Sequence, residues 1–357
     1  MALKPFLYAS EARIAGAWQG TRRALRDLRG SWSHCLSRMV DETALVLKEE
    51  KGQVNLADVK KVCLYAHYDR DSRVEDYVLN CIQELSKLGY GVVFVTVSRH
   101  LTAESIERLA PFCAWIVHRK NRGWDFGSWK VASRFTGPLE SYDEVVLAND
   151  SVYGPVKALG PIFEKMGKNE AALWGITDSW MNRYHVQSYF AVLRKSYLAL
   201  PAFKTFWENI RFVRDRYFVV SRYEMGLTQT AIRAGLPVAV LCPYGDAVKA
   251  GREKIEARYA KLVGAERYAT RLPEAWYCKK VLTRCLDGIP MDPMHFFWDA
   301  LIDPLGCPFI KRELLSRNPM AVPNVNEWEP IVRAASSYDT QMIHRHLQRI
   351  VRQRSPC

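Results

Sequence analysis

The chain has 357 residues, with 51 Lys and Arg against 38 Asp and Glu, and a formal charge of +13. Its hydrophobic fraction of 48% and aromatic fraction of 12% indicate a folded protein with one large domain and appendages, or two domains. The sequence contains no run of about 18 apolar residues, so we predict no transmembrane helix. Its N-terminus lacks the pattern of a signal peptide. The nine Cys are scattered without a Cys-x-x-Cys pair, which argues against a zinc site and fits a cytoplasmic protein.

The basic excess suits an anionic partner, such as nucleic acid, a phospholipid surface or a diphosphate substrate. The first segment concentrates basic residues from Arg13 to Arg38 and interleaves them with apolar ones such as Trp18 and Trp32. This pattern fits an amphipathic helix lying on a membrane. The alternative, which we favour, is a helix packed on the main domain with a solvated basic face.

Residues 1–58 are predicted to be mainly helical. The next part alternates strands and helices, and it predicts half of a nucleotide-binding sheet with right-handed crossovers. Its expected elements are a strand at 61–68, a helix at 72–89 opened by a capping box of Ser72 and Glu75, a strand at 92–97, a helix at 102–109 and a strand at 114–117. Neither a glycine-rich dinucleotide fingerprint nor a phosphate loop accompanies them, so dehydrogenase and kinase functions lose support.

Two stretches beyond these strands carry polar residues that suit a ligand. The loop at 118–130 combines Arg122, Gly123 and Asp125, and we favour a functional loop over a solvated loop in which Asp125 caps a helix. The apolar run after Tyr142 ends in Asn149-Asp150-Ser151, which follows a buried strand. Because open α/β sheets bind ligands at the carboxyl ends of their strands, Asp150 is placed to meet a metal or phosphate. An ordinary turn is the alternative.

The remaining chain continues the α/β pattern and then changes character. Strands are expected at 171–177, 186–193 and 237–241. Glu224 opens a short amphipathic helix that ends at Gly235, and the helix macrodipole alone would account for an acid there. Residues from 244 to 290 are charged and are predicted to be helical.

Four motifs resemble those of the rhamnan synthesis F family of bacterial polysaccharide-assembly proteins. They are Asn121-Arg122-Gly123-Trp124-Asp125-Phe126-Gly127, Asn149-Asp150-Ser151-Val152-Tyr153-Gly154-Pro155, His185-Val186-Gln187-Ser188-Tyr189-Phe190 and Pro308-Phe309-Ile310-Lys311-Arg312-Glu313-Leu314-Leu315. The resemblance implies an α/β, GT-A-like glycosyltransferase with helical extensions. It also implies transfer of a deoxyhexose, typically L-rhamnose from dTDP-rhamnose, onto a cell-surface glycan.

The resemblance assigns roles to individual residues. Glu224 is the expected catalytic base, with Asp178 in reserve, and Asp150 and His295 are the expected ligands of a divalent metal, Mg2+ or Mn2+. A single acid in the metal motif leaves metal dependence open, and a lone His beside Phe296 and Phe297 is more often packed than ligating. The donor is expected to meet His67, Tyr68, Asp69, Arg122, Gly123, Asp125, Asn149, Asp150 and Ser151, and the acceptor His185, Gln187 and Ser188.

The expected organisation is a basic N-terminal segment (1–58), a GT-A-like domain (59–245) and a mainly helical C-terminal region (246–357) that completes the site. The resemblance further implies a lipid-linked acceptor and peripheral contact with the cytoplasmic face of the inner membrane. A non-catalytic glycan-binding subunit of a polysaccharide assembly complex is the alternative function. Nucleic-acid binding ranks last, because no recognisable nucleic-acid module accompanies the basic excess.

Overall fold

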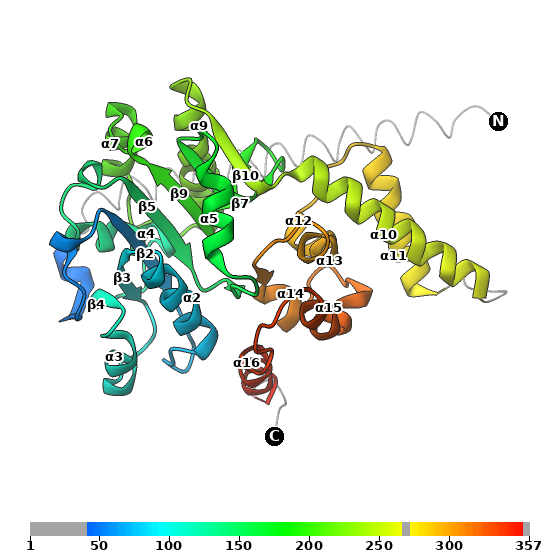
Figure 1. Cartoon of the computed structure of the whole chain (residues 1–357), viewed down its shortest axis with the longest axis horizontal. Coiled ribbons are helices and arrows are strands. Elements are labelled where there is room, and N and C mark those ends of the chain that lie inside the picture. The colour runs from blue at the N-terminus through cyan, green and yellow to red at the C-terminus, as the bar shows by residue number, and fades with distance from the viewer. Residues whose placement is uncertain (1–40, 266–271, 353–357) are drawn as a thin grey trace, which may run out of the picture.

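The computed structural model describes residues 41–265 and 272–352. The basic N-terminal segment lies almost wholly outside the described residues, so neither of its two interpretations is tested. The α/β class is confirmed: a central sheet is flanked by helices, and a helical C-terminal region lies at one side of it (Figure 1).

The main sheet has nine strands in the order β1-β4-β3-β2-β5-β9-β7-β10, with β8 paired to β7. Strands β4, β3, β2 and β5 are parallel, and β9 inserts antiparallel between β5 and β7. Their bounds are β1 (Val46–Lys51), β2 (Lys61–His67), β3 (Tyr90–Thr96), β4 (Cys113–Arg119), β5 (Glu144–Asn149), β7 (Leu173–Ser179), β8 (His185–Val186), β9 (Phe190–Arg194) and β10 (Val238–Cys242). The carboxyl ends of β2, β4, β5 and β7 therefore meet at one edge of the sheet.

Helices cover both faces of the sheet. Successive residues of a strand point to opposite faces, and the central strands carry apolar side chains on both faces, so both must be covered. In β2, Cys63 and Tyr65 belong to one apolar cluster, and Val62 and Leu64 belong to the other. The helices of this part are α2 (Asp76–Lys87), α3 (Ala103–Leu109), α4 (Trp124–Ala132), α5 (Leu159–Gly167), α6 (Lys195–Leu198), α7 (Pro201–Glu208), α8 (Arg216–Phe218) and α9 (Met225–Arg233).

The structure corrects the predicted helix over the end of the N-terminal segment. Residues Val46–Lys51 form strand β1, which pairs antiparallel with β4. The sequence of β1 has ordinary helix propensity, but pairing covers an edge of β4 that would otherwise expose unpaired backbone groups. Tertiary context therefore overrides the local preference.

The predicted capping box at Ser72 is also wrong. Helix α2 begins at Asp76 with Glu75 at the N-cap, and Ser72 instead adopts a positive φ of 62°. The Ser72 hydroxyl accepts a hydrogen bond from the His100 backbone at 2.9 Å, so it joins two loops rather than capping the helix. The predicted apolar face of the helix is correct, since Tyr77, Val78, Cys81, Ile82 and Leu85 are buried.

Two further predictions are corrected near the candidate site. The expected short helix after Glu224 is present as α9, but Glu224 also ends a π-helical turn, Val219–Glu224, that runs directly into α9, so the macrodipole of a free helix terminus does not explain this acid. The strand expected at 186–193 is divided into β8 and β9, and the break between them exposes the backbone N–H of Ser188 to a side-chain partner.

The C-terminal region returns to the sheet after a helical hairpin. Strand β11 pairs with the short β6 (Val152–Tyr153), directly after the Asn149-Asp150-Ser151 turn, and α16 packs against α2. The elements are α10 (Tyr244–Ala265), α11 (Pro273–Leu286), α12 (Pro293–Phe296), α13 (Trp298–Ile302), β11 (Ile310–Lys311), α14 (Arg312–Ser316), α15 (Trp328–Ala335) and α16 (Gln341–Arg352). Among the described helices, none is both long and apolar enough to cross a membrane.

Candidate active site

An asparagine at the end of β5 joins two of the predicted loops. The Asn149 side-chain amide donates to Oδ2 of Asp125 at 2.9 Å, and its Oδ1 accepts from the backbone N and Oγ of Ser151 at 3.0 and 2.6 Å. Asn149 is thus fully engaged within the protein. It fixes Asp125, in the first turn of α4, beside the turn that holds Asp150.

Asp125 is electrostatically unusual. Burial, followed by the negative charges of Asp150 and Glu224, raises the pKa of this carboxyl to about 6. Hydrogen bonds bring these acids into one region. Asn149, which bonds to Asp125 and precedes Asp150, donates its backbone N–H to the Tyr189 carbonyl, and the neighbouring Ser188 bonds to Glu224. A cluster of acids at the carboxyl edge of a parallel sheet, one of which has a raised pKa, is typical of a functional site.

A buried arginine that the sequence analysis missed shapes the loop after β4. The Arg119 guanidinium is 1% exposed and donates to the backbone carbonyls of Lys120, Arg122 and Trp124 at 3.0, 2.6 and 3.0 Å. It also donates to the Ser128 hydroxyl, and burial lowers the pKa of Arg119 to about 9. The loop that contains Arg122 is therefore held in shape from within.

Gly123 is the N-cap of α4, and its backbone lies in the left-handed region with φ 80°. A Cβ built at this position would lie 2.9 Å from Cα of Phe212, so both the conformation and the space require glycine. The predicted role of Gly123 in donor binding stays a prediction, but its role in setting the direction of α4 is structural.

Asp150 forms an ion pair with an arginine from the C-terminal region. Nη1 of Arg312 lies 2.7 Å from Oδ2 of Asp150 and donates to the Tyr77 hydroxyl at 3.1 Å. The Arg312 backbone N–H bonds to the Ser151 carbonyl at 2.9 Å, which continues the β6–β11 pairing. The motif that contains Arg312 is recognisable in the sequence, but its pairing with Asp150 across about 160 residues depends on the fold.

The loop after β2 is closed by α16. His67 is buried, with Nδ1 3.0 Å from the Thr96 hydroxyl, and burial lowers its pKa. Asp69 accepts from Nη2 of Arg349 at 2.5 Å, and Arg349 also pairs with Asp71 and Glu75. Tyr68 is 45% exposed and remains accessible. In the predicted nucleotide-binding loop, Asp69 and Asp71 thus both pair with Arg349 of the C-terminal helix α16.

Glu224 and Ser188, the predicted base and a predicted acceptor residue, are in direct contact. Oε1 of Glu224 accepts from both the backbone N and the hydroxyl of Ser188 at 2.9 Å. These bonds fix one carboxylate oxygen, Oε1, and do not involve Oε2. The sequence placed the two residues about 35 positions apart without linking them.

The reserve base and the other acceptor residues have structural partners. Oδ1 of Asp178 accepts from the Tyr244 backbone at the start of α10 at 2.6 Å, and burial raises the pKa of Asp178. Gln187 accepts from Thr177 at 2.7 Å and donates to Asp292 at 3.2 Å. The ring of His185 bonds to the Arg183 carbonyl at 2.7 Å. Asp178 thus acts as a cap of α10, which weakens its case as a base.

The residues predicted to bind metal do not form a suitable donor set. His295 is 4% exposed, and its charged neighbours are Asp292, at 3.8 Å, Lys311 and Glu313 rather than Asp150. Asp150 is already neutralised by Arg312. Within residues 41–265 and 272–352, no group of three or more His, Cys, Asp or Glu side chains could hold a metal ion. A hard divalent cation prefers several oxygen ligands, so these residues do not fit Mg2+ or Mn2+.

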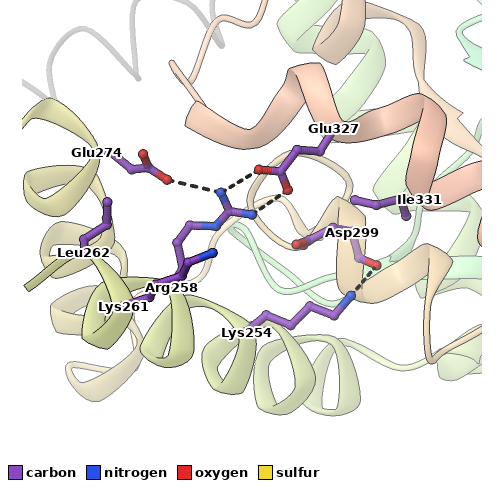
Figure 2. Close-up of a pocket in the computed structure, with 8 residues that line it drawn as sticks. All are labelled: Lys254, Arg258, Lys261, Leu262, Glu274, Asp299, Glu327 and Ile331. Atoms are coloured by element: carbon purple, nitrogen blue, oxygen red, sulfur yellow. Dashed lines mark hydrogen bonds and ion pairs between the residues drawn. The ribbon is translucent and has the colours of Figure 1, made fainter. Parts of the chain in front are cut away.

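A separate cleft of about 550 Å³ lies between α10, α11 and the C-terminal helices (Figure 2). Arg258 occupies its centre and pairs with Glu274 at 3.1 Å and with Glu327 at 2.7 Å. Nζ of Lys254 donates to the Asp299 carbonyl at 3.1 Å. None of the predicted site residues lines this cleft. Its paired cations brace the hairpin against the C-terminal helices.

The chain is thus an α/β protein with a polar, acid-rich edge at the carboxyl ends of its strands. The model of the family described as rhamnan synthesis protein F matches residues 92–248, and this confirms the resemblance over that stretch. The match includes Asp125, Asn149, Asp150 and Glu224 and stops before Arg312.

Relatives of known sequence agree only at moderate identity. Virulence protein VirA of Vibrio anguillarum is 27% identical over 271 residues, which cover 74% of this chain and 83% of its own. The uncharacterised protein y4gN of Sinorhizobium fredii is 25% identical over 186 residues, which cover 50% of this chain and 47% of its own.

Solved structures align more loosely. A protein of Desulfovibrio desulfuricans described as a nucleotide-diphospho-sugar transferase aligns with 66% of this chain and 100% of its own, at 13% identity and a TM-score of 0.32. A mannosyltransferase of Pyrobaculum calidifontis in complex with GDP-Man and Mn2+ aligns with 95% of this chain and 91% of its own, at 10% identity and a TM-score of 0.27. Such low TM-scores carry no functional argument.

Proposed function

We propose that the protein is a nucleotide-sugar-dependent glycosyltransferase that moves a deoxyhexose, L-rhamnose from dTDP-rhamnose, onto a lipid-linked surface glycan. The observation that carries the proposal is the grouping of Asp125, Asp150 and Glu224 at one edge of the sheet. Asn149 bonds to Asp125 and directly precedes Asp150, and its backbone N–H bonds to the Tyr189 carbonyl next to Ser188, the partner of Glu224. The family match over residues 92–248 supports the reaction class. The donor would lie along the loops after β2, β4 and β5.

In this proposal Glu224 is the catalytic base. Its Oε2 takes the proton of the acceptor hydroxyl as that oxygen bonds to the anomeric carbon. The bond between the anomeric carbon and the diphosphate oxygen breaks, and the electron pair leaves with the diphosphate. Ser188 holds the other carboxylate oxygen, so Glu224 keeps one orientation during the transfer.

The test is calorimetric titration of the purified chain with dTDP-rhamnose, UDP-sugars and GDP-sugars. We expect a heat of binding with dTDP-rhamnose and none with the UDP- or GDP-sugars. Selective binding of a different nucleotide sugar would retain the reaction class and change the donor. A folded protein that binds no donor would contradict the proposal.

The paired state of Asp150 favours one alternative, a non-catalytic glycan-binding subunit of a polysaccharide assembly complex, because the only acid of the metal motif is already neutralised. Release of nucleoside diphosphate from a bound donor in the presence of a glycan acceptor would exclude this function.

A membrane contact through α11 agrees with a lipid-linked acceptor. The outward face of α11 presents Trp276, 63% exposed, and Leu286, 77% exposed, with Lys279 and Lys280 between them. The opposite face packs Cys278 and Val281 inward. Lysines attract anionic headgroups and an exposed Trp inserts at the interface, so we propose an anionic lipid surface as the partner.

Co-sedimentation of the whole chain with vesicles tests this contact. Vesicles of phosphatidylglycerol and phosphatidylethanolamine should retain the wild type, and Trp276→Ser should weaken retention several-fold. Ile232→Ser, which removes an exposed apolar residue on α9, is the matched control. Equal retention of Trp276→Ser and the wild type would place the contact elsewhere.

A further inference from the structure

We propose that Arg312 supplies the positive charge that meets the donor diphosphate, in place of a divalent metal, so that donor binding needs no metal ion. This inference rests on the proposed function, because it requires a diphosphate ligand at the carboxyl edge of the sheet. It names a residue outside the family-matched stretch and outside the predicted site.

The first argument is the position of Arg312. Its guanidinium lies against Asp150, the one carboxylate of the turn where a metal motif is expected. Three contacts hold the residue in place: the ion pair with Asp150, the hydrogen bond to Tyr77 and the backbone bond to Ser151. A cation is therefore already built into the protein where a bound metal would contribute one.

The second argument concerns the other oxygen donors of the turn. The Asn149 side chain is engaged by Asp125 and by Ser151, so it offers little to a metal. A divalent ion at Asp150 would also lie within a few ångströms of the Arg312 charge, and like charges that close repel strongly in a partly buried site. The replacement of a second acid by Asn149 fits a site that uses a guanidinium.

The third argument is that Arg312 retains donors for a ligand. Both side-chain hydrogen bonds of Arg312 to the described residues leave from Nη1, and none leaves from Nε or Nη2. The side chain is 26% exposed, so these donors reach the surface of the site. A planar fork of N–H groups suits two phosphate oxygens and keeps its charge at any physiological pH.

The experiment compares nucleoside diphosphate with monophosphate binding, in EDTA and in Mn2+. Wild type and Arg312→Gln are titrated with dTDP and dTMP, and with the uridine and guanosine pairs if those bind better. We expect wild-type affinity for the diphosphate to be unchanged by EDTA. We expect Arg312→Gln to lose about 10- to 100-fold for the diphosphate and little for the monophosphate, since charged hydrogen bonds contribute about 1.5–3 kcal/mol.

Arg317→Gln is the matched control, because Arg317 follows α14 on the same segment and its side chain is 66% exposed. Thermal melting checks that each variant folds. Asp150→Asn gives a second measurement if Arg312→Gln does not fold: binding in EDTA should survive in this variant, because Arg312 remains. If Asp150 were a metal ligand, the same substitution would abolish Mn2+-dependent binding.

Three outcomes overturn the inference. Diphosphate binding that disappears in EDTA and returns with Mn2+ would give the role to a metal. Equal diphosphate affinity of Arg312→Gln and the wild type would remove Arg312 from the site while leaving the proposed function intact. A folded wild type that binds no nucleotide at all would overturn the proposed function and this inference with it.

Discussion

Two regions of the molecule, the carboxyl edge of the sheet and the cleft beside the helical hairpin, contain similar ion pairs in different surroundings. At the carboxyl edge of the sheet, Arg312 pairs with Asp150, whose side chain is only 8% exposed, while Asp125 nearby is held by an amide rather than by a cation. In the cleft of the helical hairpin, Arg258 pairs with two carboxylates, Glu274 and Glu327, whose side chains are 33% and 49% exposed. In the first region Asp150 pairs with a cation, while Asp125 and Glu224 form no ion pair with the described residues; in the second region Arg258 pairs with both Glu274 and Glu327, which are partly solvated.

The difference distinguishes the proposed active site from a structural brace. Asp125, which has no ion pair among the described residues, has a raised pKa. Its ionisation therefore costs stability, and such a cost is typical of functional rather than purely structural regions. Arg258, by contrast, pairs with two partly exposed acids, and its effect is limited to joining the elements that carry them. The comparison therefore predicts that substitutions at the carboxyl edge affect activity and pH dependence, whereas those at the cleft affect only a modest part of the stability.

The largest expected effect is at Glu224. Glu224→Gln retains the oxygen that accepts from Ser188, so the variant should fold and bind donor normally. It should lose sugar transfer by about 10²- to 10⁴-fold, the usual contribution of a general base. Glu208→Gln, on the exposed surface of α7, is the matched control, and steady-state transfer rates are the measurement. Full activity of Glu224→Gln would remove this residue from the mechanism.

The next effect is on stability at Arg119. Arg119→Met leaves three backbone carbonyls without their buried donor, so the free energy of unfolding should fall by about 3 kcal/mol. Arg119→Lys should recover only part of this, because an ammonium does not reach all three carbonyls in the fork geometry of a guanidinium. Denaturant titration measures both variants. Arg134→Met, at an exposed position, should change stability little, and an equal loss there would contradict a specific role for Arg119.

The pH dependence of stability distinguishes two acids of the site. Because the pKa of Asp125 is raised to about 6, above the usual unfolded value of about 3.9, its ionisation opposes folding increasingly from about pH 4 to pH 6. Asp125→Asn should therefore gain in melting temperature, relative to wild type, across that interval. Burial acts to raise the pKa of Asp69, but the hydrogen bonds from Arg349, Arg73 and Asp71 and the charge of Arg349 together outweigh burial and lower the pKa.

Asp69 therefore provides a control of opposite sign. Its ionised form stabilises the fold above about pH 4, and that contribution is lost as the pH falls through its lowered pKa. Asp69→Asn should fall behind wild type in melting temperature as the pH rises from about 3 to 5. The same sign of slope for both variants would show that the two environments do not differ as described.

The sequence predicted the sheet well because its signals are local. Short apolar runs ending in polar residues mark β2, β4 and β5, and the turn at Asn149-Asp150-Ser151 marks the edge where the acids gather. The predictions that failed depend on distant partners. Strand β1 exists because β4 offers an edge, and Ser72 has a positive φ because its hydroxyl binds a loop 28 residues away.

The candidate site shows the same limit. The residue types at Asp125, Asp150 and Glu224 suggest acid chemistry, but their proximity depends on the fold. The cations that complete the region, Arg312 and Arg349, come from the C-terminal segment and reach Asp150 and Asp69 across more than 150 residues. No spacing rule relates such positions, so the sequence alone assigned the positive charge to Arg122 or to a metal.

The smallest expected effect is at the brace of the hairpin. Arg258→Gln removes the pairs with Glu274 and Glu327 and should lower the free energy of unfolding by about 1 kcal/mol, since both acids are partly solvated and screened. Arg252→Gln, which breaks one exposed pair with Glu256 on the same helix, should cost about 0.3–0.5 kcal/mol. Donor affinity should be unchanged in both variants, because no predicted site residue lines the cleft. A loss of donor affinity in Arg258→Gln would show that the hairpin and the carboxyl edge act together, and the distinction between brace and site would then fail.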